Sequence, residues 1–201
     1  MVEQSIWMQK VAADPGHSRW YIERFRAMAR AGEDLVGEAR LVDSIAPRGA
    51  HILDAGCGPG RLGRHLAAAG HRVVGVDVDP ALIEAAEQDH PGPQWLVGDL
   101  AELDLPARGI AEPFDVIVSA GNVMTFLAPS TRARVLGRLR AHLCSDGRAV
   151  IGFGAGRDYA FADFLDDAQA AGLVPDLLLS TWDLRPFTDD CDFLVALLRP
   201  A

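Results

Sequence analysis

The sequence predicts a doubly wound α/β fold, in which helices cover both faces of a mostly parallel sheet. From His51 onward, short β-branched runs alternate with helical stretches of the length that connects parallel strands. The first such run breaks into the glycine-rich segment GCGPG and resumes as a helix. The length of 201 residues suits a single domain, and 49% hydrophobic residues are enough for a sizeable core.

Two helical patterns precede the first predicted strand. In residues 18–31, apolar side chains recur at helical spacing, and Ser18 stands where an N-cap is expected. Residues 33–46 continue with the same periodicity until Pro47. Both segments are predicted as helices.

The remaining elements follow in alternation. Five strands are predicted over residues 51–55, 72–77, 94–99, 114–120 and 147–153. The helices that connect or follow them are predicted over residues 61–70, 80–89, 130–143 and 158–172. Asp79 precedes Pro80, which predicts an N-cap followed by a first-turn proline.

Composition limits the partners. The formal net charge of −9 argues against a surface that follows nucleic-acid phosphates. No run approaches the ~18 apolar residues of a membrane span, and the N-terminus lacks the pattern of a signal peptide. The 3 cysteines are too scattered to indicate a metal site. We therefore expect a cytoplasmic protein that binds no nucleic acid, membrane or metal.

The glycine-rich break indicates a ligand site. Parallel sheets of this type bind ligands beyond the carboxyl ends of their strands. In LDAGCGPG the strand ends near Asp54, and Gly56, Gly58 and Gly60 lack the β-carbons that would hold a ligand away from the backbone. The helix that begins near Arg61 offers amide donors to an anionic group.

Two ligands compete for this segment. Gly58-Pro-Gly60-Arg-Leu-Gly63 satisfies the dinucleotide pattern G-x-G-x-x-G, and Asp77 could bind ribose hydroxyls, which favours an NAD-dependent oxidoreductase. Asp54, however, would repel a pyrophosphate. A cationic ligand suits that carboxylate better, and S-adenosylmethionine carries an amino group, a carboxylate, a ribose and an adenine. A third hypothesis is a non-catalytic regulatory module that binds S-adenosylmethionine.

The motifs resemble those of the Rossmann-like (class I) S-adenosylmethionine-dependent methyltransferases. ILDAGCGPGRLGRHLAAAGHRVVGVDVDPALIEAAEQ is similar to the first two family motifs, and WLVGDLAEL and FDVIVSAGNVMTFL are similar to the third and fourth. The resemblance covers roughly residues 50 to 155. It implies a seven-stranded sheet whose last strand is antiparallel, with VPDLLLSTWDL and CDFLVALLRP as the last two strands.

The resemblance also implies a set of cofactor contacts. The loop around the methionine moiety would contain Asp54, Gly56, Gly58 and Gly60. Asp77 would accept from the ribose hydroxyls beside Val78, and Asp99 would accept from the adenine amino group beside Leu100. The segment along the cofactor after the fourth strand would be Ala120, Gly121 and Asn122.

The acceptor side is less defined. We expect residues 1–49 to form a helical lid and residues 50–201 the methyltransferase domain, as one globular unit. Tyr21 resembles the lid tyrosine of many family members, and His17 and Tyr21 are the candidate catalytic residues. Arg157, Trp182 and Arg185 are expected toward the substrate side. The expected reaction is in-line methyl transfer to a small-molecule acceptor by a monomer or homodimer.

Overall fold

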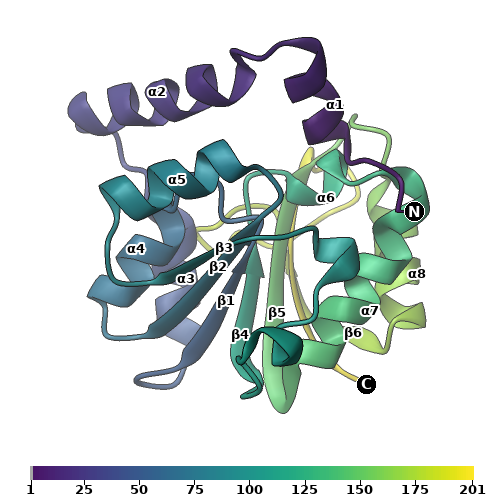
Figure 1. The fold of residues 1–201 in the computed structure, drawn as a ribbon. Helices are drawn as coiled ribbons and strands as arrows, with labels where there is room; N and C mark the ends of the chain where they lie inside the picture. Colours follow the sequence, from purple (N-terminus) through teal and green to yellow (C-terminus); the bar gives the residue numbers. More distant parts are fainter. Residues whose placement is uncertain (1) are drawn as a thin grey trace.

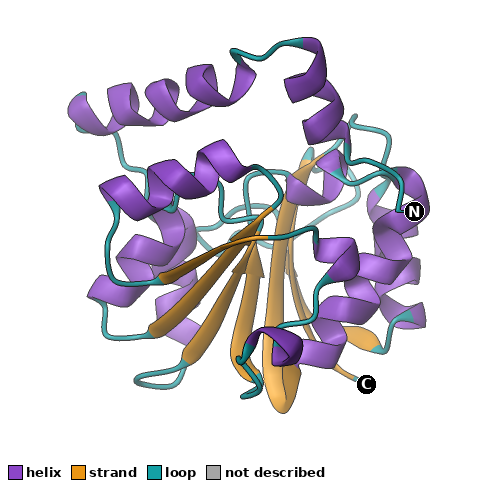
Figure 2. Ribbon diagram, in the orientation of Figure 1, coloured by secondary structure: helices purple, strands orange, loops and turns teal. Residues whose placement is uncertain are grey.

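The computed structural model describes residues 2–201 and contains a seven-stranded sheet between two layers of helices (Figures 1 and 2). The strand order is β3-β2-β1-β4-β5-β7-β6. The strands are β1 (His51–Ala55), β2 (Arg72–Asp77), β3 (Gln94–Val97), β4 (Phe114–Ser119), β5 (Leu143–Gly154), β6 (Leu173–Leu179) and β7 (Phe193–Pro200). Strands β1 to β5 pair in parallel, and β7 runs antiparallel to β5 and β6. The predicted fold class is confirmed.

Two layers of helices complete the domain. One sheet face packs against α3 (Gly37–Ile45), α4 (Arg61–Ala68) and α5 (Pro80–Asp89). The other face packs against α7 (Arg132–His142) and α8 (Phe161–Ala170). Short helical turns complete the chain: α6 (Val123–Phe126) and the 3₁₀ turns Leu100–Glu102, Pro106–Arg108 and Pro129–Thr131.

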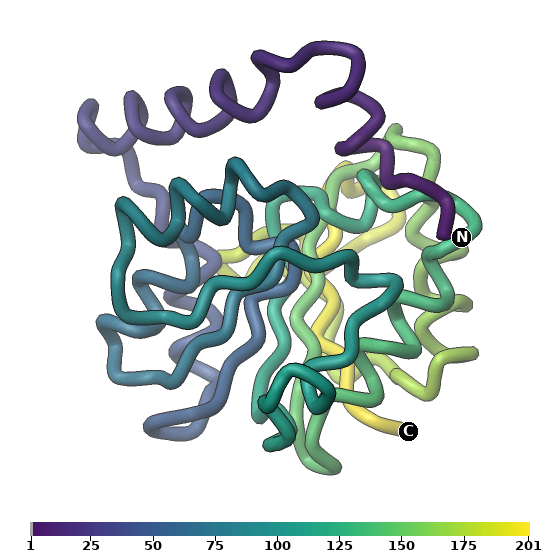
Figure 3. Tube along the Cα trace, in the orientation of Figure 1, coloured from purple at the N-terminus to yellow at the C-terminus, as the bar shows by residue number. Residues whose placement is uncertain are grey.

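The N-terminal segment crosses the carboxyl ends of the strands. Helices α1 (Ile6–Ala13) and α2 (His17–Arg30) lie above the sheet edge, and we refer to residues 6–30 as the N-terminal helix pair (Figures 1 and 3). Helix α3 differs from this pair, because its Ala39, Leu41 and Val42 are buried in the core on one sheet face. None of the helices within residues 2–201 is long and apolar enough to cross a membrane.

Several element boundaries differ from the sequence predictions. Helix α1 was not predicted; it begins after Ser5, whose Oγ accepts from the Met8 amide at 3.3 Å. Strand β3 ends at Val97 rather than residue 99, because Asp99 Oδ1 accepts from the Ala101 amide and starts a 3₁₀ turn. Strand β6 ends at Leu179 rather than residue 184, where the chain turns and the Ser180 amide donates to the Arg185 carbonyl.

The capping prediction for Ser18 is wrong and that for Asp79 is confirmed. Helix α2 begins at His17 after Gly16, and Ser18 lies inside its first turn, where its hydroxyl is buried against Asp79. Asp79 Oδ1 accepts from the Ala81 amide at 2.9 Å and caps α5. Ser18 therefore makes a tertiary contact instead of a local one.

A tryptophan sets the spacing between the sheet and two helices. The Trp95 side chain on β3 is buried, and an added β-carbon at Gly75 on β2 would lie 2.3 Å from its Cε3 atom. Added β-carbons at Gly63 and Gly60 would lie 2.8 and 2.9 Å from the same ring system. These glycines allow α4 and the turn before it to approach the sheet closely.

We expect Gly75→Ala to lower the free energy of unfolding by about 1–3 kcal/mol, because the new methyl group overpacks the Trp95 ring. Gly137→Ala is the matched control: Gly137 lies within α7 with nothing within 4 Å of an added β-carbon. This control should raise stability by about 0.5–1 kcal/mol, since alanine favours a helix. Urea unfolding measures both, and equal stability of Gly75→Ala and wild type would contradict the packing account.

Candidate functional site

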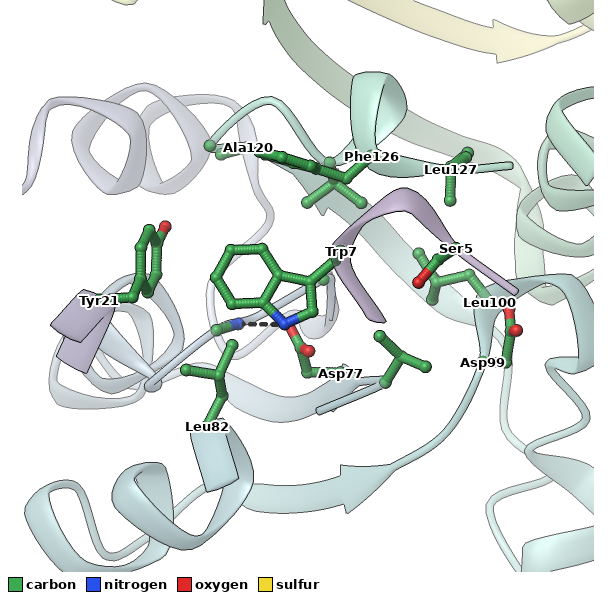
Figure 4. Close-up of a pocket in the computed structure, with 15 residues that line it drawn as sticks. Ser5, Trp7, Tyr21, Asp77, Leu82, Asp99, Leu100, Ala120, Phe126 and Leu127 are labelled. Carbon is green, nitrogen blue, oxygen red and sulfur yellow. Dashed lines mark hydrogen bonds between the residues drawn. The ribbon is translucent and has the colours of Figure 1, made fainter. Parts of the chain in front are cut away.

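The carboxyl ends of β1, β2 and β4 surround a cavity beneath the N-terminal helix pair (Figure 4). It encloses about 630 Å³ of empty space, part of which is open to solvent. Fifteen residues form its wall: Ser5, Trp7, Tyr21, Gly56, Gly58, Asp77, Val78, Leu82, Asp99, Leu100, Ala120, Gly121, Val123, Phe126 and Leu127. The wall is mostly apolar, with two carboxylates from different strand ends.

The glycine-rich turn supplies one wall. Gly56 and Gly58 both have positive φ, at 82° and 54°, a conformation that favours glycine. An added β-carbon at Gly58 would point at the Tyr21 ring, 3.8 Å away, and one at Gly56 would collide with Val123. The turn therefore presents bare backbone to the cavity, and Tyr21 of α2 lies across it.

Asp77 lies at the bottom of the cavity and is 8% exposed. Its Oδ2 accepts from the Gly58 amide at 2.8 Å and its Oδ1 from the Asp79 amide at 3.0 Å. Each carboxylate oxygen has two lone pairs, so both can still accept from a ligand hydroxyl. Burial raises the pKa of Asp77 to about 6, against the effect of these two amide donors.

Asp54 lies beside the cavity rather than in its wall. Its Oδ2 accepts from the Gly63 amide of α4 at 3.1 Å, and the side chain is buried. It borders a smaller adjoining pocket with Tyr21, Gly58 and Arg61. Burial raises the pKa of Asp54 to about 7, and the nearby Arg61 guanidinium opposes this shift.

Two predicted residues make structural contacts instead of lining the cavity. An added β-carbon at Gly60 would meet Ala86 and Trp95, so Gly60 allows close helix packing. Asn122 adopts a left-handed conformation before α6, and its Oδ1 accepts from the Gly154 amide at 2.8 Å. The side chain of Asn122 thus ties the end of β4 to the end of β5. Within residues 2–201, neither residue belongs to the cavity wall.

The other predicted residues are distributed as follows. Tyr21, Gly56, Gly58, Asp77, Val78, Asp99, Leu100, Ala120 and Gly121 all line the cavity. His17 lies outside its wall and packs against Trp7 at 4.9 Å between ring centroids. Trp182 packs over Gly152 on the sheet, Arg185 pairs with Asp183 at 3.7 Å, and Arg157 borders a separate surface hollow.

Sequence reasoning missed Trp7, whose indole ring lies in the middle of the view of the cavity (Figure 4). The ring meets Tyr21 edge-on at 5.1 Å and Phe126 at 5.6 Å. Its Nε1 donates to Asp79 Oδ2 at 2.9 Å. A Ser5 cap followed by Ile6 and Trp7 could have signalled a short helix, but no local pattern indicates where the ring goes.

Comparison with known proteins gives a consistent result. Residues 52–147 match a family model described as a methyltransferase domain. A crystal structure described as a TehB-like SAM-dependent methyltransferase from Corynebacterium glutamicum is 51% identical, with a TM-score of 0.88; the match covers 94% of this chain and 100% of that one.

Two curated relatives share a smaller part of the chain. The magnesium-protoporphyrin O-methyltransferase of Rhodobacter capsulatus is 33% identical over 126 residues, and the malonyl-[acyl-carrier protein] O-methyltransferase of Pectobacterium atrosepticum is 30% identical over 105 residues. These matches cover 59% and 52% of this chain, but only 52% and 40% of the two relatives. The 51% identity to the Corynebacterium protein extends over nearly the full length of both chains. Together with the fold, it shows that the chain belongs to the Rossmann-like S-adenosylmethionine-dependent methyltransferases.

Proposed function

We propose that the chain transfers a methyl group from S-adenosylmethionine to a small-molecule acceptor. The observation that carries this proposal is the convergence of Asp77, Asp99 and the Gly56–Gly58 turn around one cavity. When bound, S-adenosylmethionine supplies a methyl group on a positively charged sulfur that is a good leaving group. The protein then has to orient the two reactants and keep water away from them.

The cavity residues fit this cofactor by their chemistry. Asp77 can accept from both ribose hydroxyls with the lone pairs that its two amide donors leave free. Asp99 uses Oδ1 to accept from the Ala101 amide, and its other oxygen can accept from an adenine amino group. Val78 and Leu100 offer apolar walls for the adenine ring.

The opposite end of the cavity suits the methionine moiety. Gly56 and Gly58 let a ligand approach the backbone, and Asp54 places a carboxylate in the adjoining pocket, where an amino group would find a partner. A pyrophosphate at the glycine turn would be repelled by Asp54, a buried carboxylate. This charge distribution favours S-adenosylmethionine over NAD.

The lining of the site and the relatives support a small acceptor. The cavity is partly closed by Tyr21 and Trp7, which favours a small acceptor over a polymer. The names of the curated relatives state a porphyrin and a carrier-bound malonyl group as acceptors. We therefore favour a small or flat acceptor, free or presented by a carrier. The alternative, a non-catalytic module, would bind the cofactor without turnover. A methyl-transfer screen across such acceptors therefore separates an enzyme from such a module.

Asp77→Ala should weaken the binding of S-adenosylhomocysteine at least tenfold, because two hydrogen bonds to a charged acceptor, worth about 1.5–3 kcal/mol each, are lost. Isothermal titration calorimetry measures the change. Asp104→Ala is the control, since Asp104 is exposed and its contact is to the Ala107 amide, away from the cavity. Unchanged affinity in a folded Asp77→Ala protein would remove the assignment of the ribose site.

The affinity for S-adenosylhomocysteine should fall as the pH is lowered through about 6, the pKa of Asp77 in the ligand-free protein. Protonation removes the negative charge that accepts the ribose hydroxyls, so binding below this pH requires release of a proton and weakens by about tenfold per pH unit. Titration calorimetry between pH 5 and 8 tests this. Asp54, whose pKa is about 7, also titrates in this range. The Asp77→Asn protein, which cannot titrate at position 77, should therefore lose the step near pH 6 and keep the one near pH 7. An unchanged step near pH 6 in that variant would assign it to another group.

His17→Ala and Tyr21→Phe should each lower kcat by less than the ~100-fold expected for loss of a general base. The physical reason is that displacement from a sulfonium depends mainly on alignment, and that the His17 ring lies outside the cavity wall, stacked on Trp20 and tilted against Trp7. Steady-state kinetics with an identified acceptor measures kcat. A loss of three orders of magnitude in His17→Ala, with cofactor affinity intact, would identify His17 as a base.

A further inference from the structure

One carboxylate connects both N-terminal helices to the domain. Asp79 follows β2, is 2% exposed, and uses its two oxygens for different purposes. Oδ1 caps α5 by accepting from the Ala81 amide. Oδ2 accepts from Trp7 Nε1 of α1 at 2.9 Å and from Ser18 Oγ of α2 at 2.5 Å.

The other contacts between the N-terminal helix pair and the domain are a partly exposed ion pair and apolar packing. Arg26 of α2 makes a bidentate pair with Asp89 of α5, at 2.8 and 3.0 Å, but both side chains are about one-third exposed, so water and salt screen this pair more than a buried contact. Apolar packing of Trp7 and Ile22 against Leu82 and Ala85 has no directional preference. The two buried hydrogen bonds to a charged acceptor therefore determine where the pair sits.

In the position that Asp79 stabilises, the N-terminal helix pair covers the cavity. Trp7 and Tyr21 line the cavity from above and contact each other edge-on at 5.1 Å. Tyr21 lies one helical turn after Ser18, so fixing Ser18 also fixes the face of α2 that carries Tyr21. The Asp79 amide in turn donates to Asp77 Oδ1, which links this contact to the floor of the cavity.

We propose that Asp79 is a positioning residue for methyl transfer: through Oδ2 it holds Trp7 and Ser18, and with them Tyr21, over the bound cofactor. The consequence for catalysis rests on the proposed function, whereas the effect on the N-terminal helix pair does not. Cofactor entry and product release require these two hydrogen bonds to open. The helix pair thus acts as a lid whose closed position depends on a single carboxylate oxygen.

The capping and positioning roles of Asp79 can be separated by substitution. Serine caps helices about as well as aspartate, so Asp79→Ser retains the contact to the Ala81 amide. Its side chain is too short to reach Trp7 and Ser18 as well. Trp7→Phe and Ser18→Ala remove the same two hydrogen bonds from the lid side and leave the cap intact.

The first measurement uses the protein without cofactor. In hydrogen–deuterium exchange, Asp79→Ser should reduce the protection of residues 6–30 at least tenfold, while the amides of β1, β4 and α7 keep theirs. Asp104→Asn is the matched control, because this exposed aspartate accepts from the Ala107 amide and does not line the cavity. Unchanged protection of residues 6–30 in Asp79→Ser would overturn the proposal.

The second measurement is the dissociation rate of S-adenosylhomocysteine by stopped-flow fluorescence. Asp79→Ser should raise this rate at least tenfold, and Trp7→Phe should add little in the Asp79→Ser background, because both remove the same bond. If the effects of Asp79→Ser and Trp7→Phe on the dissociation rate were additive, the proposal would be overturned. If no variant or wild type binds this ligand, the proposed function fails, and the exchange measurement still decides the role of Asp79.

Two further variants control for a general loss of stability in Asp79→Ser. If Asp79→Ser exchanges faster throughout the domain, Trp7→Phe and Ser18→Ala decide the question, since they do not touch the α5 cap. Faster exchange limited to residues 6–30 in these two variants supports the proposal. Full protection of residues 6–30 in both of them overturns it.

Discussion

The close approach of α4 and its preceding turn to the sheet depends on the Trp95 side chain and three glycines. The ring fills the space that Gly60, Gly63 and Gly75 leave free, and an added β-carbon at any of them would come within 3.0 Å of it. This contact holds α4 at the end of β1, so that the Gly56–Gly58 turn faces the cavity. The pattern G-x-G-x-x-G therefore serves two purposes here: Gly58 borders the cavity, whereas Gly60 and Gly63 allow helix packing.

Three buried aspartates lie near the ends of β1 and β2 and differ in their partners. Asp54 accepts from an amide of α4, Asp77 accepts from the glycine turn, and Asp79 accepts from two side chains of the N-terminal helix pair. Burial of a carboxylate costs free energy unless donors surround it, and each of these residues has at least one backbone amide as a donor. The raised pKa values of Asp54 and Asp77 show that those donors do not fully offset the loss of water.

The aromatic cluster between the helix pair and the domain gives the cavity its upper wall. The rings form a chain of edge-on contacts, Phe25 to Tyr21, Tyr21 to Trp7 and Trp7 to Phe126, with centroids 4.9 to 5.6 Å apart. Such contacts favour burial without fixing a single geometry. The Trp7 ring carries an N–H group, and its hydrogen bond to Asp79 selects one arrangement of the cluster.

Much of the fold and part of the site could be predicted from the sequence, because the relevant signals are local. Strand and helix periodicity, the glycine turn and the acids at strand ends depend on residues close in the chain, and nine of the predicted cofactor contacts line one cavity. Other features depend on which distant side chains meet. The Trp7 contact spans 72 residues, and Ser18, Gly60 and Asn122 find partners 61, 35 and 32 residues away. No local pattern encodes these contacts, because they form only once the sheet order and the path of the N-terminal helices bring the segments together.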